Sequence, residues 1–157
     1  MRFRRTILLT VLAALALPAL AQAQATSNME ILRQKVKADK KLLVAQNMQL
    51  TDAEAKAFWP VYDAYQNDLQ QINQRVGKAI AEYADAYNKG PVPNETAKKL
   101  LNETFAVEEA ELNLKRSYVP KLEKALPAAK VARYVQIENK IRAAIRYELA
   151  DAIPLVQ

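Results

Sequence analysis

The chain has 157 residues, no cysteine, no histidine and a formal net charge of +6 at pH 7. Without histidine it lacks the most common general base, the most common transition-metal ligand and any Ser-His or Cys-His nucleophile pair. With only two glycines it has no glycine-rich phosphate loop. We therefore expect no enzymatic activity, no cofactor and no metal centre.

Residues 1–25 have the pattern of a secretory signal peptide. Arginines precede an apolar run over about residues 7–20, which is too short to span a bilayer, and small residues follow at alternate positions. This pattern predicts cleavage after Ala23 or Ala25. It also predicts export, which in a Gram-negative cell means a periplasmic location. We expect residues 26–157 to form a single domain.

The basic excess lies in two short segments. Arg2, Arg4 and Arg5 belong to the predicted signal peptide, and their removal lowers the net charge from +6 to +3. The segment 29–47 carries five basic and two acidic residues, which accounts for the rest. A nucleic-acid partner is not expected, because the charge and the compartment both argue against it.

The rest of the chain is typical of helices. Ala, Leu, Glu, Lys and Gln dominate, and no segment alternates convincingly with a period of two. We predict an all-α fold of four long helices in an elongated helical-hairpin arrangement with coiled-coil character. The expected helices cover residues 28–47, 52–89, 95–126 and 128–152. A thin layer of long helices leaves apolar surface uncovered, so we also expect a homodimer.

The first predicted helix is basic on one arc and apolar on the other. Its basic arc holds Arg33, Lys37, Lys40 and Lys41. Such a helix can bind an acidic protein surface or anionic lipid, and it can equally be an ordinary amphipathic helix with a solvated lysine face. The four residues are candidate partner-binding residues.

The second predicted helix opens with a capping signal at Leu50, Thr51 and Glu54. Thr51 fits the N-cap position, and Glu54 fits the third helical position, from which its side chain reaches back to the Thr51 amide. A core stripe follows with steps of three or four residues: Phe58, Tyr62, Tyr65, Leu69, Ile72, Val76, Ile80, Tyr83 and Tyr87.

Trp59 lies about 100° away from this stripe. It is a candidate anchor for a partner if it is exposed. Alternatively, it packs under a neighbouring helix near the bend that Pro60 is expected to cause.

The third predicted helix is apolar over a wide arc, so we expect it to lie between neighbours. Its two adjacent stripes are Leu101, Phe105, Leu112, Val119, Leu122, Leu126 and Leu100, Val107, Leu114, Tyr118. Its acidic residues cluster early and its basic residues late, which complements the helix dipole. A kink is expected at Pro120.

The fourth predicted helix places one acid on its apolar face. Glu138 is either a buried carboxylate with a raised pKa or a metal contact, or it pairs with a Lys or Arg from a neighbouring helix or subunit. Arg142 and Arg146 lie to the sides of this face and complete the set of candidate partner-binding residues.

The segment Leu50-Thr51-Asp52-Ala53-Glu54 resembles the LTxxQ motif of the Spy/CpxP-like periplasmic family, with Glu54 in place of the glutamine. The nearest second copy is Leu126-Pro127-Ala128-Ala129-Lys130, which keeps only the leucine. The resemblance implies a four-helix, hairpin-like protein that dimerises into a curved cradle. It further implies an ATP-independent chaperone or a modulator of envelope-stress sensors. The metal-binding members of the family use histidines, which this chain lacks.

Taken with the resemblance, the sequence predicts a periplasmic protein that binds unfolded protein clients or regulatory protein partners. One alternative is a dedicated signalling subunit whose partner is the periplasmic sensor domain of an envelope-stress system or an anti-sigma protein. Another is a protein that makes weak contact with anionic membrane surfaces through its first helix.

Overall fold

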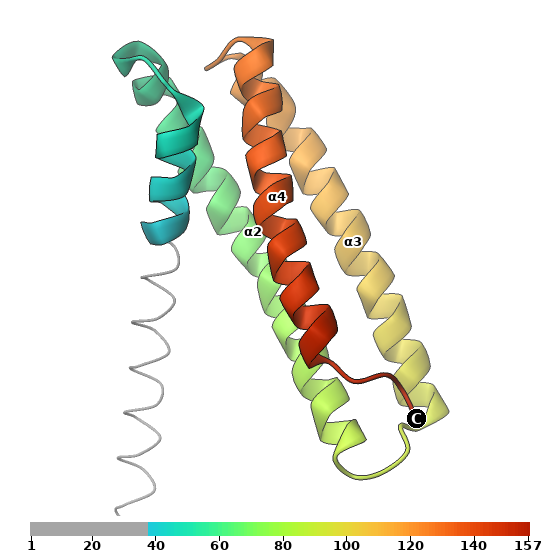
Figure 1. The fold of residues 1–157 in the computed structure, drawn as a ribbon. Coiled ribbons are helices and arrows are strands. Elements are labelled where there is room, and N and C mark those ends of the chain that lie inside the picture. Colours follow the sequence, from blue (N-terminus) through green and yellow to red (C-terminus); the bar gives the residue numbers. More distant parts are fainter. Residues whose placement is uncertain (1–37) are drawn as a thin grey trace, which may run out of the picture. The chain divides into compact units, whose positions relative to one another are not determined.

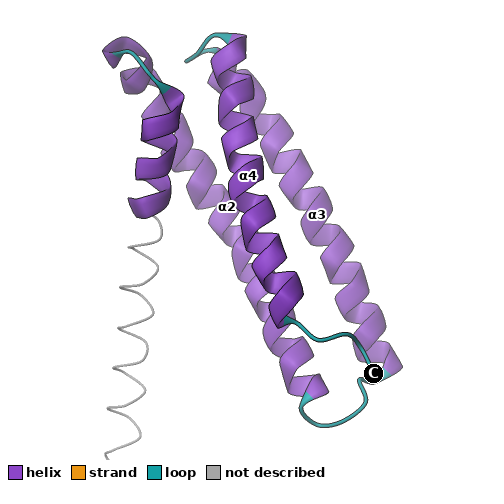
Figure 2. Ribbon diagram, in the orientation of Figure 1, coloured by secondary structure: helices purple, strands orange, loops and turns teal. Residues whose placement is uncertain are grey.

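The computed structural model describes residues 38–157, which form an all-α structure (Figures 1 and 2). The chain divides between Gln46 and Asn47 into two units. The first unit contains most of a helix that covers residues 38–48. The second contains helices α2 (Asp52–Tyr87), α3 (Asn94–Glu123) and α4 (Ala128–Ala152).

The predicted helices are confirmed to within a few residues wherever the structure describes their ends. The predicted signal peptide, Arg33, Lys37 and the start of the first helix lie outside the described residues. The prediction of one domain over residues 26–157 stays a prediction.

Helices α2 and α3 form an antiparallel hairpin, and α4 returns along it parallel to α2 (Figure 1). The loop 88–93 between α2 and α3 contains Gly90, whose φ of 129° favours glycine. We call the end of this unit where α2 and α4 begin the closed end. The end with the loop 88–93 and the last turn of α4 is the open end.

The predicted capping box at the start of α2 is confirmed. The Thr51 hydroxyl accepts a hydrogen bond from the Glu54 amide at 3.3 Å, and the Thr51 amide donates to the Glu54 carboxylate at 2.8 Å. Two of the amides that a helix start leaves unpaired are thereby satisfied. Pro60 and Pro120 lie within α2 and α3, and both helices continue through them.

The buried side chains of this unit gather toward the closed end. In α2 burial stops at Ile72, although the apolar stripe continues to Tyr87. Val92 in the loop 88–93 is the buried exception at the open end. The buried residues of the three helices and the turn between α3 and α4 are Phe58, Tyr62, Tyr65, Leu69, Ile72, Val107, Tyr118, Leu122, Leu126, Val131, Tyr134 and Glu138.

Aromatic rings fill the space between α2 and α4. No Cα atom of α2 lies within 8 Å of one in α4, so large side chains must bridge the two helices. Tyr134 of α4 does so, with ring centroids 5.1 Å from Phe58, 6.0 Å from Tyr62 and 6.2 Å from Tyr65. All three pairs are edge-to-face, a favoured geometry for aromatic rings.

Exposed ion pairs link α2 and α3 toward the open end. Arg75 pairs with Glu103 at 2.8 Å, and Lys99 pairs with Glu82 at 2.6 Å. Exposed pairs of this kind stabilise a fold far less than a buried aromatic side chain does. The open end is therefore the less stable half of this unit.

Two phenylalanines test this distribution of stability. Phe58→Ala removes a ring that is 0% exposed and should lower the free energy of unfolding by about 3–5 kcal/mol. Phe105→Ala removes a ring that is 58% exposed and, at a concentration where the chain is monomeric, should change it by about 0.5 kcal/mol or less. Urea denaturation followed by circular dichroism measures both, and equal losses would contradict a core confined to the closed end.

Candidate functional site

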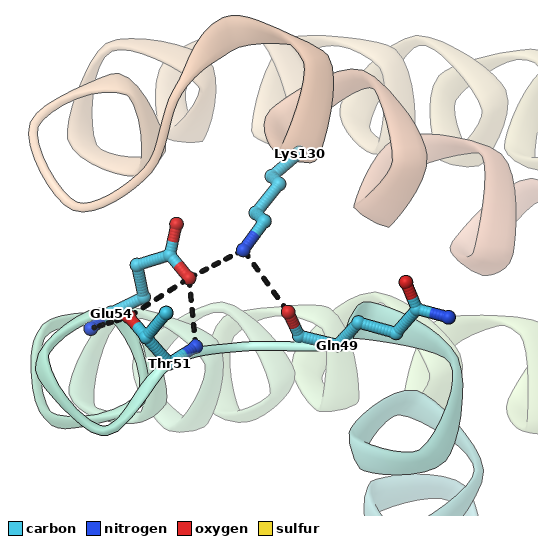
Figure 3. Close-up of polar contacts among 4 residues, drawn as sticks. All are labelled: Gln49, Thr51, Glu54 and Lys130. Carbon is cyan, nitrogen blue, oxygen red and sulfur yellow. Dashed lines mark hydrogen bonds and ion pairs between the residues drawn. The ribbon is translucent and has the colours of Figure 1, made fainter.

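A polar clasp joins the starts of α2 and α4 at the closed end (Figure 3). The Lys130 ammonium donates to the Glu54 carboxylate at 2.5 Å and to the Gln49 carbonyl at 3.0 Å. Gln49 has a φ of 50°, in the left-handed region that few non-glycine residues adopt. Glu54 therefore has two roles, since it caps α2 and also binds α4.

The clasp brings together the segments 50–54 and 126–130, the second of which shares only its leucine with the LTxxQ motif. Glu54 ends the first segment and Lys130 ends the second, and each occupies the third position of its helix. A partial signal for this contact was present in the sequence, because the two segments can be aligned at Leu50 and Leu126. The pairing of their last residues was not expected.

A second set of polar groups joins α2 and α4 beside the ring of Tyr134. Glu138 of α4 is 5% exposed and accepts a hydrogen bond from the Gln66 side chain of α2 at 2.9 Å. The same Gln66 amide group donates to the Tyr134 hydroxyl at 3.2 Å. Burial, followed by the nearby Glu138 charge, raises the pKa of Tyr134 far above its ordinary value. Tyr134 is therefore a neutral bridge at physiological pH. Glu138 is buried, and each of the roles predicted for it stays a prediction.

Two arginines connect α4 to α3. Arg142 pairs with Glu111, and both side chains are mostly covered. Arg146 reaches Glu111 at 3.1 Å and Glu108 at 3.6 Å. Burial lowers the pKa of Arg142, which nevertheless remains charged, as arginine does in proteins. Both arginines therefore hold helices together, and their predicted role in partner binding stays a prediction.

The other candidate partner-binding residues are placed as follows. Trp59 is half-buried, and its ring lies 5.0 Å from Phe58 and 5.3 Å from Tyr62, edge-on to both. Trp59 lies at the rim of the aromatic cluster. Its exposure is intermediate, so it matches neither the exposed nor the buried alternative that the sequence left open. Lys40 and Lys41 lie on the helix 38–48. A role in partner binding stays a prediction for these three residues as well.

An apolar surface that the sequence analysis did not localise lies at the open end. The stripe of α2 remains half-exposed beyond Ile72, and the corresponding side of α4 carries an exposed Ile145. We define the open-end surface by six residues: Val76, Ile80, Tyr83, Tyr87, Ile145 and Leu149. A signal was present in the sequence, because the α2 stripe extends past the residues that α4 could cover with its aromatic side chains.

A separate apolar stripe runs along α3. Leu101, Phe105 and Leu112 are all exposed and lie within about 40° of one line along the helix. We call these three residues the α3 stripe. Helix α3 lies between neighbours as predicted, since α2 and α4 both pack against it. Its apolar arc is wider than those two helices cover.

Among residues 38–157, no cluster of three or more Asp, Glu, His or Cys side chains is arranged to hold a metal ion. In the same residues, no helix combines the length and hydropathy needed to cross a bilayer. Searches against protein-family models, curated proteins and solved structures found no match to this chain.

The clasp makes stability depend on pH. Hydrogen bonds from Lys130 and from the Thr51 amide hold the pKa of Glu54 below its ordinary value of 4.5. The folded state thus binds this proton less tightly than the unfolded chain. The stabilisation is complete above pH 4.5 and is lost as the pH falls through the folded-state pKa.

Glu54→Gln isolates this effect, because glutamine still accepts the Thr51 amide but carries no charge for Lys130. We expect the variant to be less stable than the parent at pH 7 and the difference to shrink as the pH falls to about 3. Urea denaturation at each pH measures the difference. Glu123→Gln, at an exposed acid of α3, serves as the control. A stability difference that is constant with pH would contradict the clasp.

Proposed function

We propose that this protein is an exported, ATP-independent binder of non-native or regulatory protein segments, which it holds on the open-end surface. The observation that carries the proposal is the uneven core. The residues that continue the α2 stripe past Ile72 are half-exposed, whereas those before it are buried. Binding an apolar segment there would remove the same kind of surface from water that folding already removes at the closed end.

Both acidic and basic side chains line the groove between α2 and α3 toward the open end, among them Arg75, Lys78, Glu82 and Lys99. Mixed charges in the same half of the unit would attract clients of either charge and keep the contact reversible. Passive holding of this kind lowers the concentration of aggregating chains by mass action and needs no nucleotide.

The test uses the chain without its predicted signal peptide. An unrelated enzyme is unfolded in guanidinium and diluted into buffer, and its aggregation is followed by light scattering. We expect near-stoichiometric amounts of the protein to suppress the scattering without ATP. Ile145→Ser should weaken suppression several-fold. The control Tyr147→Ser, at an exposed residue about 200° away around α4, should not. No suppression at several-fold molar excess would rule out general client binding.

The rival function is that of a signalling subunit with one dedicated sensor or anti-sigma partner. Affinity capture from an envelope extract separates the two possibilities, because a single stoichiometric partner favours signalling and a heterogeneous set favours general client binding. Salt-sensitive binding to anionic vesicles would instead favour the membrane-surface alternative.

A second copy of this chain is the occupant that we propose for the α3 stripe. Glu109 and Arg116 are exposed and flank the same side of that stripe. When two copies of α3 pair in antiparallel fashion about Leu112, flanks of the same side meet. Glu109 of each copy then faces Arg116 of the other, and Phe105 faces Val119. The charge separation along α3 thus complements itself in a symmetric dimer.

Charge exchange tests this pairing. Glu109→Arg alone and Arg116→Glu alone place like charges opposite each other and should weaken dimerisation about tenfold. The double exchange restores opposite charges and should recover most of the loss. Sedimentation equilibrium measures the dimer constant. A monomer at all concentrations, or a double variant as weak as the single ones, would contradict the antiparallel arrangement.

A further inference from the structure

The residues after α4 lie across the open end as an extended segment. The chain leaves the helix at Ile153, which has extended backbone angles, and ends close to the start of α3 in the view of Figure 1. The Tyr83 hydroxyl donates a hydrogen bond to the Pro154 carbonyl at 2.9 Å. The Gln157 side-chain amide donates to the Tyr87 hydroxyl at 3.0 Å. We call residues 153–157 the strap.

The two tyrosines form a small site on the surface of α2. They are the last members of the α2 stripe, one helical turn apart, with ring centroids separated by 5.8 Å. Tyr83 binds the strap through a backbone carbonyl, a group that every residue carries. The aromatic rings supply apolar contact area beside that hydrogen bond. Recognition by this pair therefore depends little on the sequence of the bound segment.

The strap is held loosely. Leu155 is 89% exposed, and Val156 and Pro154 are also exposed, so the segment buries little apolar surface. Its two hydrogen bonds to tyrosine lie at exposed positions, where water competes for the same groups. Only Ile153 is half-buried. Opening of such a segment needs far less free energy than global unfolding.

We propose that Tyr83 and Tyr87 form a binding site for extended, apolar, uncharged segments of other proteins, and that the strap fills this site until such a segment displaces it. This inference rests on the proposed function and specifies which segments the open-end surface takes. The strap itself supplies the argument for that chemistry. Residues 153–157 read Ile-Pro-Leu-Val-Gln, without a charged side chain, and they already occupy the site in extended form.

The test measures how the full chain binds fluorescently labelled α-lactalbumin that has been reduced and carboxymethylated so that it stays unfolded. Ile153→Ser combined with Pro154→Gly removes the half-buried side chain and the fixed φ of proline, which weakens the strap and leaves both tyrosines intact. Fluorescence anisotropy should show about tenfold tighter binding than the parent chain, because two surface hydrogen bonds hold the strap. Adding Tyr83→Phe should remove most of this gain. Adding Tyr147→Phe, the matched control on α4, should leave the gain intact.

The remaining outcomes of this experiment separate a failure of the strap proposal from a failure of the proposed function. If the parent and the strap-weakened chain bind with equal, measurable affinity, the strap does not compete with the client, and the proposed function still stands. Weaker binding by the strap-weakened chain would also contradict competition by the strap, since the strap would then contact the client directly. No binding by any variant would overturn the proposed function itself. If the double substitution lowers the helical content, Gln157→Ala replaces it, with an expected gain of about threefold from one lost hydrogen bond.

Discussion

The packing of Tyr134 against three aromatic side chains of α2 is the interaction on which the second unit depends. The backbones of α2 and α4 are too far apart for small side chains to meet, and Tyr134 spans the space between them. Without that ring, α4 would keep its contacts to α3 through Arg142 and Arg146 and its clasp through Lys130. Those contacts are polar and partly solvated. They orient α4, but the aromatic burial supplies most of the stabilising free energy.

The position of this cluster explains the two different ends of the unit. Tyr134 lies less than two turns into α4, so the aromatic contacts are confined to the closed end. Further along, α4 presents arginines to α3 where a continued core would need apolar side chains. The apolar stripe of α2 nevertheless continues to Tyr87. The chain thus carries more apolar surface at the open end than its own helices cover, and this excess is what a binding function requires.

The elements that local sequence determines were predictable, and those set by contacts between distant residues were not. The periodicity of α2 predicted its helix and the core stripe as far as Ile72, but the prediction that the core continues to Tyr87 was wrong. Thr51 and Glu54 predicted the start of α2, because capping depends on residues three apart. The clasp between Glu54 and Lys130 joins residues 76 positions apart, and no local pattern encodes such a pair.

In the candidate site, too, local features were predictable and contacts between helices were not. The sequence indicated that Arg142 and Arg146 lie beside the apolar face of α4, but it could not show that Glu111 of α3 lies opposite both. It also placed Phe105 on an apolar stripe without showing that α2 and α4 leave that stripe exposed. Which part of a wide apolar arc is covered depends on how the helices pack, and periodicity within one helix does not contain that information.

One end of the second unit holds its core, and we propose that the other end binds protein segments. Hydrogen exchange measured along the chain, with and without an unfolded client, distinguishes the two ends. We expect slow exchange in α2 before Ile72 and faster exchange from there to Tyr87, with added protection only in that second region when the client is present. Uniform protection of α2 without client, or new protection confined to the closed end, would contradict it.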